Sequence, residues 1–169
     1  TGYSVDLLKL IRQRLQTQFK KPIRLNLEES TVSNRFNLIE FKKAMIECGS
    51  TTITQQRLEK VDFSLPFFLS GSQFLLKLNE SSNFEIGSTL AKVPIAYIPG
   101  TTTDQIIRQI YPFARWIPVE TSKEGIQQLN QGKVKAVAND GILLIGELVR
   151  QGNNPQNYAI VPTQPITTE

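Results

Sequence analysis

The chain contains no histidine among its 169 residues. This absence excludes Ser-His-Asp and Cys-His catalysis, histidine pH switching and the common zinc sites. Phosphate loops, dinucleotide glycine patterns and calcium loops are also missing. A single cysteine, Cys48, excludes an internal disulfide, and its apolar neighbourhood predicts a buried strand with a packed thiol. We therefore expect no cofactor, no metal ion and no histidine-dependent catalysis.

Long apolar runs are missing as well. The runs that are present, such as Phe74–Leu76, fall far short of the ~20 residues that a membrane span needs. Hydrophobic residues make up 40% of the chain and charged residues 20%, which is typical of a globular protein.

The net charge of +4 arises from 19 basic and 15 acidic residues. The densest basic cluster consists of Lys20, Lys21 and Arg24, and the other lysine pairs lie far from it in sequence. No strip combines aromatic and basic residues for base stacking. We therefore expect a mildly basic, solvated surface and no nucleic-acid partner.

Apolar periodicity predicts the elements of the first half. Leu7, Leu8, Ile11, Leu15 and Phe19 recur at helical spacing and predict a helix over residues 5–20. The arrangement of apolar residues also predicts strands over 23–27, 44–48 and 74–78, and a short helix over 34–43.

The polar stretch Asn79–Gly87 predicts a linker, beyond which strands and helices alternate regularly. We expect strands over 93–98, 116–119, 134–138 and 158–161, and helices over 104–111, 121–132 and 142–150. Thr121 and Glu124 form a capping-box pattern. The alternation predicts an α/β protein with largely parallel sheets in two lobes. The lobes span residues 1–80 and 93–162, joined by a hinge region over 81–92, with a return crossover over 163–169.

The segment 49–57 follows a predicted strand, at the edge where open α/β sheets bind ligands. Ser50 and Thr52 supply hydroxyls, and Arg57 can place a planar fork on a carboxylate. Such charge-assisted bonds contribute roughly 1.5–3 kcal/mol each. The alternative is a threonine-rich turn with a surface arginine.

A second such edge is the segment 99–104, which follows a predicted strand and opens a helix. Its glycine permits a tight turn, and exposed amide groups at a helix start attract anions. The alternative is ordinary N-capping by Thr102 or Thr103.

Asp140 lies at the third edge, just past the strand 134–138. Its carboxylate can take a ligand ammonium group or cap the helix that begins near Gly141. In chain order the sequence thus offers an arginine with hydroxyls, an anion-binding turn and a carboxylate. These groups suit a zwitterion, so we expect a cleft that binds one.

Several motifs are specific enough to indicate a family. They are Gly2-Tyr3-Ser4-Val5-Asp6; Asn34-Arg35-Phe36 followed by Leu38; Glu47-Cys48-Gly49-Ser50-Thr51-Thr52; and Arg57 with Val61-Asp62-Phe63-Ser64-Leu65-Pro66-Phe67. Gly100-Thr101-Thr102, Gly132-Lys133, Asp140 and Gly146-Glu147 follow in order. The chain thereby resembles, over essentially its whole length, the periplasmic amino-acid-binding proteins, bacterial extracellular solute-binding family 3. The third motif is most similar to the glutamate/aspartate-binding subgroup, and the fourth is shared with ionotropic glutamate receptors.

The resemblance implies a two-lobed type 2 periplasmic-binding fold and a role for each matching residue. Arg57 and Thr52 would hold the ligand α-carboxylate, helped by Thr102 and its neighbour Thr101. Asp140 and the carbonyl of Ser50 would take the α-ammonium group. Arg35 matches an arginine that reaches the side-chain carboxylate in the glutamate/aspartate subgroup; its alternative is a solvated residue at a helix start.

The chain also departs from that subgroup. Ser122 stands where the subgroup has a histidine near the ligand side chain. A strand that precedes Gly2 and supplies another arginine, and the closing segment beyond Glu169, are not in this chain. We therefore expect an incomplete first lobe.

The resemblance implies a hinged clamp that closes on a free L-amino acid, acidic or polar, with glutamate or aspartate favoured. We expect a monomeric, periplasmic or otherwise extracytoplasmic solute receptor, with a signal peptide in its precursor and the permease of an ABC transporter as partner. One alternative is the ligand-sensing domain of a membrane receptor, such as a histidine kinase, a cyclase or a glutamate-receptor-like channel. A remote one is a cyclohexadienyl dehydratase-like enzyme, which needs a cleft acid that nothing here singles out.

Overall fold

The computed structural model describes residues 2–168 and divides the chain into two units, Thr1–Leu65 and Pro66–Glu169. The strand predicted over 74–78, placed in the first lobe by the sequence, belongs instead to the second unit. There β1 (Ser72–Lys77) pairs with two strands from later in the chain. The polar stretch after it contains a 3-10 helix, η1 (Leu78–Asn83), and also lies within the second unit.

The first unit consists of helices α1 (Tyr3–Phe19), α2 (Arg35–Glu40) and α3 (Gln55–Leu58) with long connections. The helix predicted over 5–20 is confirmed. It ends at Lys20, whose φ of 50° is left-handed. Helix α2 is shorter than predicted, and Lys42, just beyond its C-cap Phe41, has a left-handed φ of 56°.

The strands predicted over 23–27 and 44–48 are wrong, because no segment within residues 2–65 pairs with another in a ladder. Apolar patterning can favour an extended chain, but a strand needs the N–H and C=O groups of a neighbour. Met45, expected in a buried strand, is 96% exposed.

The second unit is built on one mixed sheet with the strand order β3-β2-β4-β1-β5. Its strands are β1, β2 (Pro94–Tyr97), β3 (Arg115–Pro118), β4 (Ala136–Asp140) and β5 (Tyr158–Val161). Strand β2 runs parallel to β3 and β4, as the alternation predicted. Strand β1 is antiparallel to β4 and β5, so the sheet is less uniform than expected.

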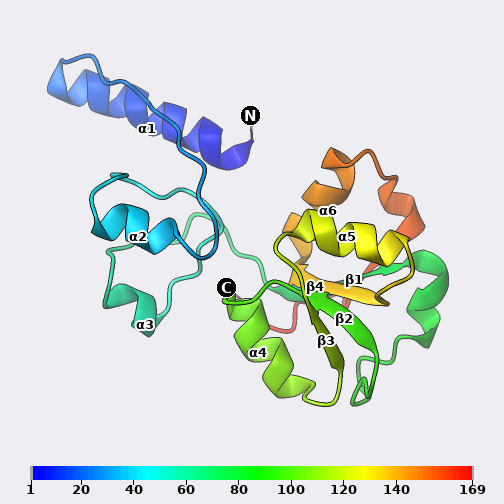
Figure 1. The fold of residues 1–169 in the computed structure, drawn as a ribbon. Helices are drawn as coiled ribbons and strands as arrows, with labels where there is room; N and C mark the ends of the chain where they lie inside the picture. Colours follow the sequence, from blue (N-terminus) through cyan, green and yellow to red (C-terminus); the bar gives the residue numbers. More distant parts are fainter. Residues whose placement is uncertain (1, 169) are drawn as a thin grey trace. The chain divides into compact units, whose positions relative to one another are not determined.

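Helices cover both faces of this sheet (Figure 1). On one face lie α5 (Ser122–Asn130) and α6 (Gly141–Arg150), and against the other lies α4 (Thr102–Ile110). Successive strand residues alternate between the two cores, as the pleat requires. Leu75 points to α5 and α6, and its neighbours Phe74 and Leu76 point to the opposite core.

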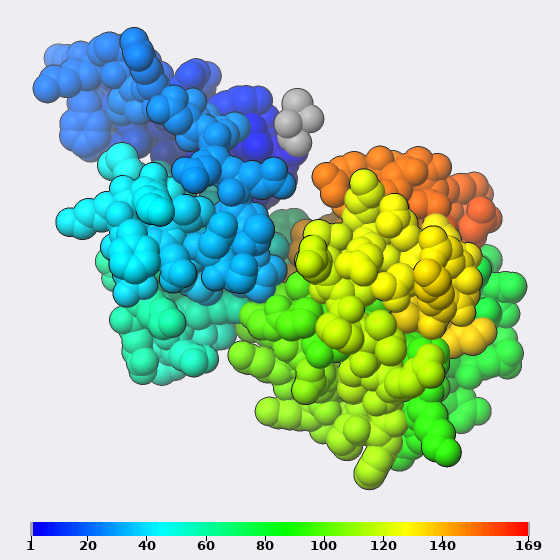
Figure 2. Space-filling view, in the orientation of Figure 1, coloured from blue at the N-terminus to red at the C-terminus, as the bar shows by residue number. Residues whose placement is uncertain are grey.

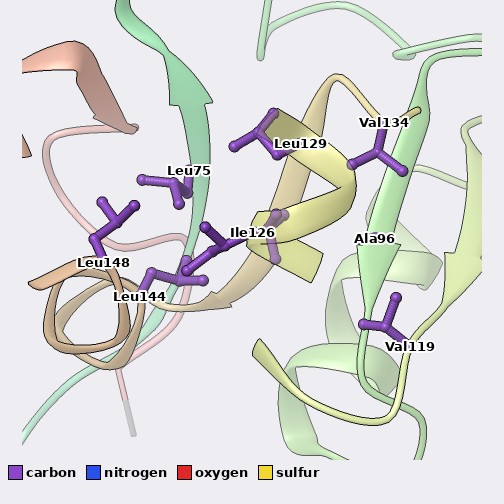
Figure 3. Close-up of a cluster of buried hydrophobic side chains, with 9 residues drawn as sticks. Leu75, Ala96, Val119, Ile126, Leu129, Val134, Leu144 and Leu148 are labelled. Atoms are coloured by element: carbon purple, nitrogen blue, oxygen red, sulfur yellow. The ribbon is translucent and has the colours of Figure 1, made fainter. Parts of the chain in front are cut away.

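The core beneath α5 and α6 is fully closed. Figure 3 shows Ile126 of α5 directed towards Leu144 of α6 and Leu75 of β1. All three side chains are 0% exposed. The two helices also lie side by side at the surface of the unit (Figure 2). This layered core holds the ends of β2, β3 and β4 in fixed positions along one edge.

Among residues 2–168, no helix combines the length and apolar character that crossing a membrane requires.

Candidate functional site

Two arginines of the first unit lie against one aromatic ring. The guanidinium carbon of Arg35 lies 5.2 Å from the centroid of Phe36, and that of Arg57 lies 5.6 Å from it. Arg35 Nη1 donates to Thr51 Oγ1 at 2.8 Å, and Arg57 Nη1 donates to the carbonyl oxygen of Thr52 at 2.7 Å. The ring and these bonds fix the direction of both cations.

The surroundings of Arg35 disfavour its charge. Burial lowers the pKa of Arg35, the nearby charge of Arg57 lowers it further, and Glu47 acts in the opposite direction. Its Nε atom is buried and makes no hydrogen bond. Two partly buried guanidinium groups with this arrangement favour an anion, because a carboxylate can accept paired N–H bonds from such a fork.

The segment that carries Arg57 is held by a local cap. Thr54 caps α3, and its hydroxyl accepts the backbone N–H of Arg57 at 3.3 Å. Thr51 and Thr52 precede this cap and hold the two arginines as described above, whereas Ser50 is exposed. The predicted residues Arg35, Thr52 and Arg57 therefore come together, and Thr51 joins them.

Cys48 was expected to be a packed thiol in a buried strand, but it is only half-buried and lies in a loop. Its Sγ lies 3.6 Å from the carbonyl oxygen of Ser4, to which it donates, and burial raises its pKa. A raised thiol pKa disfavours the reactive thiolate.

In the second unit the carboxyl ends of β2, β3 and β4 meet at one edge of the sheet, because these strands run parallel. This is the edge at which open α/β sheets bind ligands. The turn after β2 has Gly100 at a φ of 77°, and α4 begins just beyond it. Thr101 caps α4: its hydroxyl accepts the N–H of Asp104 at 3.0 Å and donates to the carbonyl of Ile98 at 2.9 Å.

Thr101 therefore caps α4. The alternative stated for this segment, N-capping by Thr102 or Thr103, is wrong. Thr102 lies in the first turn of the helix and is buried. Thr103 is also buried and accepts a hydrogen bond from Ser72 at 3.0 Å, which ties α4 to the start of β1.

Asp140 ends β4 and occupies the N-cap position of α6, but its carboxylate makes no capping bond to that helix. The capping alternative for this side chain is therefore excluded. Its backbone N–H donates to Oδ1 of Asn139 at 2.9 Å, and Nδ2 of Asn139 donates to Oγ of Ser122 at 2.9 Å. Asn139, only 9% exposed, thus links the starts of α5 and α6.

Sequence reasoning missed three residues of these arrangements: Phe36, Thr51 and Asn139. Phe36 carried a signal, because it follows Arg35 directly. Asn139 carried one too, since it is a polar residue at the end of an apolar strand. Nothing in the sequence distinguished Thr51 from the other threonines of its turn.

Comparison with known proteins gives these residues a context. The family model described as "Bacterial extracellular solute-binding proteins, family 3" matches residues 1–155. The chain belongs to this family. Among its relatives is the L-glutamate/L-aspartate-binding protein of Pseudomonas aeruginosa, 27% identical over 94% of this chain and 56% of that protein. The glutamine-binding protein of Geobacillus stearothermophilus is 26% identical over 86% of this chain and 54% of that protein.

The family-3 chain thus spans little more than half the length of the curated relatives it matches. Among solved structures it is similar to the ancestral amino acid-binding protein AncCDT-1, described as a precursor of cyclohexadienyl dehydratase. The TM-score is 0.82 at 23% identity, with 100% of this chain and 69% of that one covered. This similarity shows the type 2 periplasmic-binding fold, of which the chain contains a part.

Proposed function

We propose that this chain binds a free L-amino acid, acidic or polar, as the solute receptor of an ABC transporter outside the cytoplasm. The observation that carries the proposal is the pair of guanidinium groups, Arg35 and Arg57, oriented on Phe36 within the segment that matches the family model. An amino acid supplies the carboxylate that such a pair favours.

Each unit by itself offers groups that suit an amino acid. In the first unit, Arg57 and Thr52 hold an α-carboxylate, the carbonyl of exposed Ser50 accepts from an α-ammonium group, and Arg35 receives a side-chain carboxylate. In the second unit, Asp140 binds an α-ammonium group, and Thr102 donates to an α-carboxylate. Thr101, whose hydroxyl is engaged in capping α4, contributes its backbone N–H. The names of the two relatives above support glutamate, aspartate and glutamine as first candidates.

The test is calorimetric titration of the chain with L-glutamate, L-aspartate, L-glutamine, L-arginine and L-histidine. We expect saturable binding of one or more acidic or polar amino acids in the micromolar range, about −8 kcal/mol. The Arg57→Ala variant should lose that binding, whereas Arg24→Ala, a matched change at an exposed arginine, should retain it. Equal affinity in the two variants would contradict the proposal.

A further inference from the structure

The second unit gathers positive charge at one edge of its sheet, opposite to the carboxyl ends of β2, β3 and β4. Because these three strands are parallel, their amino ends meet at that edge, and β1, which is antiparallel to β4, ends there too. Basic residues stand at or just before each of these strand ends. We call the five of them the basic pole: Lys77, Lys92, Arg115, Lys133 and Lys135.

Backbone contacts hold members of the basic pole close together. The N–H of Lys92 donates to the carbonyl oxygen of Phe113 at 2.9 Å, two residues before Arg115. Arg115 pairs with Pro94 at the start of β2, and the N–H of Lys135 donates to the carbonyl oxygen of Pro94 at 2.7 Å. Arg115 and Lys135 therefore flank the start of β2 from its two sides.

The basic pole opposes folding more than it supports it. Lys77 lies opposite Lys135 when the register of β1 and β4 is continued two residues past its last pair, and like charges so placed destabilise a sheet. Internal contacts offset only part of this cost: Nζ of Lys135 lies 3.0 Å from Oε1 of Glu80, and Nζ of Lys77 donates to the carbonyl oxygen of Asn130 at 3.1 Å. Such a concentration of cations favours a role towards an anionic partner outside the chain.

Exposed apolar side chains stand among these cations. Leu78 directly follows Lys77 and is 53% exposed, and Phe113, whose carbonyl oxygen binds Lys92, is 66% exposed. Ile110 ends α4 at the same edge and is 47% exposed. The edge thus combines the two kinds of residue, basic and apolar, with which proteins bind the interface of a membrane.

From this arrangement we infer that the basic pole binds the surface of a bilayer that contains anionic phospholipids. Lysine and arginine attract the head groups, and the exposed apolar side chains enter the boundary between head groups and acyl chains. Leu78 and Phe113 favour a bilayer over a nucleic acid, because a nucleic-acid backbone has no apolar layer to receive them. The inference concerns a surface of the second unit alone and does not depend on the proposed amino-acid binding.

Flotation of the intact chain with lipid vesicles tests the inference. Vesicles of phosphatidylglycerol and phosphatidylcholine in equal parts should bind the chain, vesicles of phosphatidylcholine alone should not, and high salt should release it. The triple variant Lys92→Gln/Arg115→Gln/Lys133→Gln removes three exposed charges and should bind about 100-fold more weakly. Each basic residue near a membrane surface contributes about fivefold in affinity, and the three effects multiply.

The first unit supplies a matched control, Lys20→Gln/Lys21→Gln/Arg24→Gln. It removes two lysines and one arginine from exposed positions, and Lys20 has a left-handed φ of 50° as Lys92 has one of 62°. This variant should bind within about threefold of the wild-type chain, because its charges lie outside the basic pole. Circular dichroism spectra show that each variant is folded.

A second pair of variants tests the apolar contribution. Phe113→Ala should bind the anionic vesicles about fivefold more weakly, and Phe41→Ala, at a phenylalanine that is 67% exposed in the first unit, should bind as the wild-type chain does. Absence of binding to anionic vesicles, or equal losses in the two triple variants, overturns the inference. Duplex DNA bound as tightly as the vesicles, with no effect of Phe113→Ala on either, overturns it in favour of a general surface for polyanions.

Discussion

At the scale of single residues, Phe36 offsets the repulsion between two neighbouring arginines. Arg35 and Arg57 are close enough for the charge of one to lower the pKa of the other, so each disfavours its neighbour. The face of an aromatic ring is negative and attracts a cation by about 0.5–1 kcal/mol at exposed sites. Phe36 offers this attraction to both guanidinium groups, which offsets part of the repulsion between them.

Replacement of Phe36 by leucine should therefore weaken ligand binding. The loss of two cation–π contacts, about 1–2 kcal/mol together, predicts a five- to 30-fold lower affinity for the amino acid that the wild-type chain binds best. Phe41→Leu, the same change at a phenylalanine that is 67% exposed, is the control and should leave affinity unchanged. Calorimetry measures both variants, and an equal effect at the two positions would contradict the role of the ring.

Tyr111 gives a prediction for alkaline pH. Burial raises its pKa above the ordinary value of 10.0, and its hydroxyl donates to the carbonyl oxygen of Ile86 at 3.1 Å. As pH rises through 10, the unfolded chain loses this proton first, so the group stabilises the fold below that pH and ceases to do so above it. Denaturant unfolding between pH 9 and 11 should show a steeper loss of stability in the wild-type chain than in Tyr111→Phe. Parallel losses would show that Tyr111 does not contribute.

At the scale of elements, the sequence predicted most of the second unit because its local signals agree with its packing. The strand predicted over 158–161 has the bounds of β5, and the helix predicted over 142–150 lies within α6. Thr121 caps α5 as its motif indicated, although Glu124 reaches back to the N–H of Glu120 and not to that of Thr121.

The failures at this scale share one cause. A local pattern cannot specify a partner, so the strands predicted over 23–27 and 44–48 do not form where no neighbour pairs with them. For the same reason the sequence assigned β1 to the first lobe, because its place in the sheet of the second unit depends on pairing with strands more than 60 residues away. The candidate site follows the same rule: Asp140 was predicted from its own chemistry, whereas the hydrogen bond between Asn139 and Ser122 depends on a contact that no local pattern specifies.

Two glycines inside helices should respond to alanine in opposite directions. At Gly146 of α6 an added Cβ meets nothing within 4 Å, so Gly146→Ala should stabilise the second unit by about 0.5–1 kcal/mol through helix propensity. At Gly125 of α5 the Cβ would lie 2.9 Å from a methyl carbon of Val137. Overpacking costs about 1–3 kcal/mol, so Gly125→Ala should destabilise by about 1 kcal/mol after the propensity gain.

Urea unfolding of the two glycine variants beside the wild-type chain measures both changes. A shift of the midpoint without a change in slope identifies each as an effect on stability. Stabilisation by both substitutions would show that α5 can move away from the sheet at little cost.

At the scale of the whole molecule, the two units differ in how much they bury. Every hydrophobic side chain that is fully buried, from Phe74 to Leu148, lies in the second unit. Within residues 2–65 no side chain is buried, and α1 has none among its 17 residues. Apolar burial is the main source of stability, so the second unit has a source of cooperativity that the first lacks.

Hydrogen exchange on the intact chain should therefore separate the units. Amides of β1, β2 and β4, which lie between two closed cores, should exchange by global unfolding and show the highest protection. Amides of α1 and α2 should exchange at lower free energies, by local opening, because little apolar surface is exposed when those helices open. A saturating amino-acid ligand should raise protection around Arg35 and Arg57 in proportion to its concentration over its Kd, since binding favours the folded form. Equal protection in α1 and β1 would instead show that the chain unfolds as one cooperative body, and that the first unit draws its stability from contacts other than a core of its own.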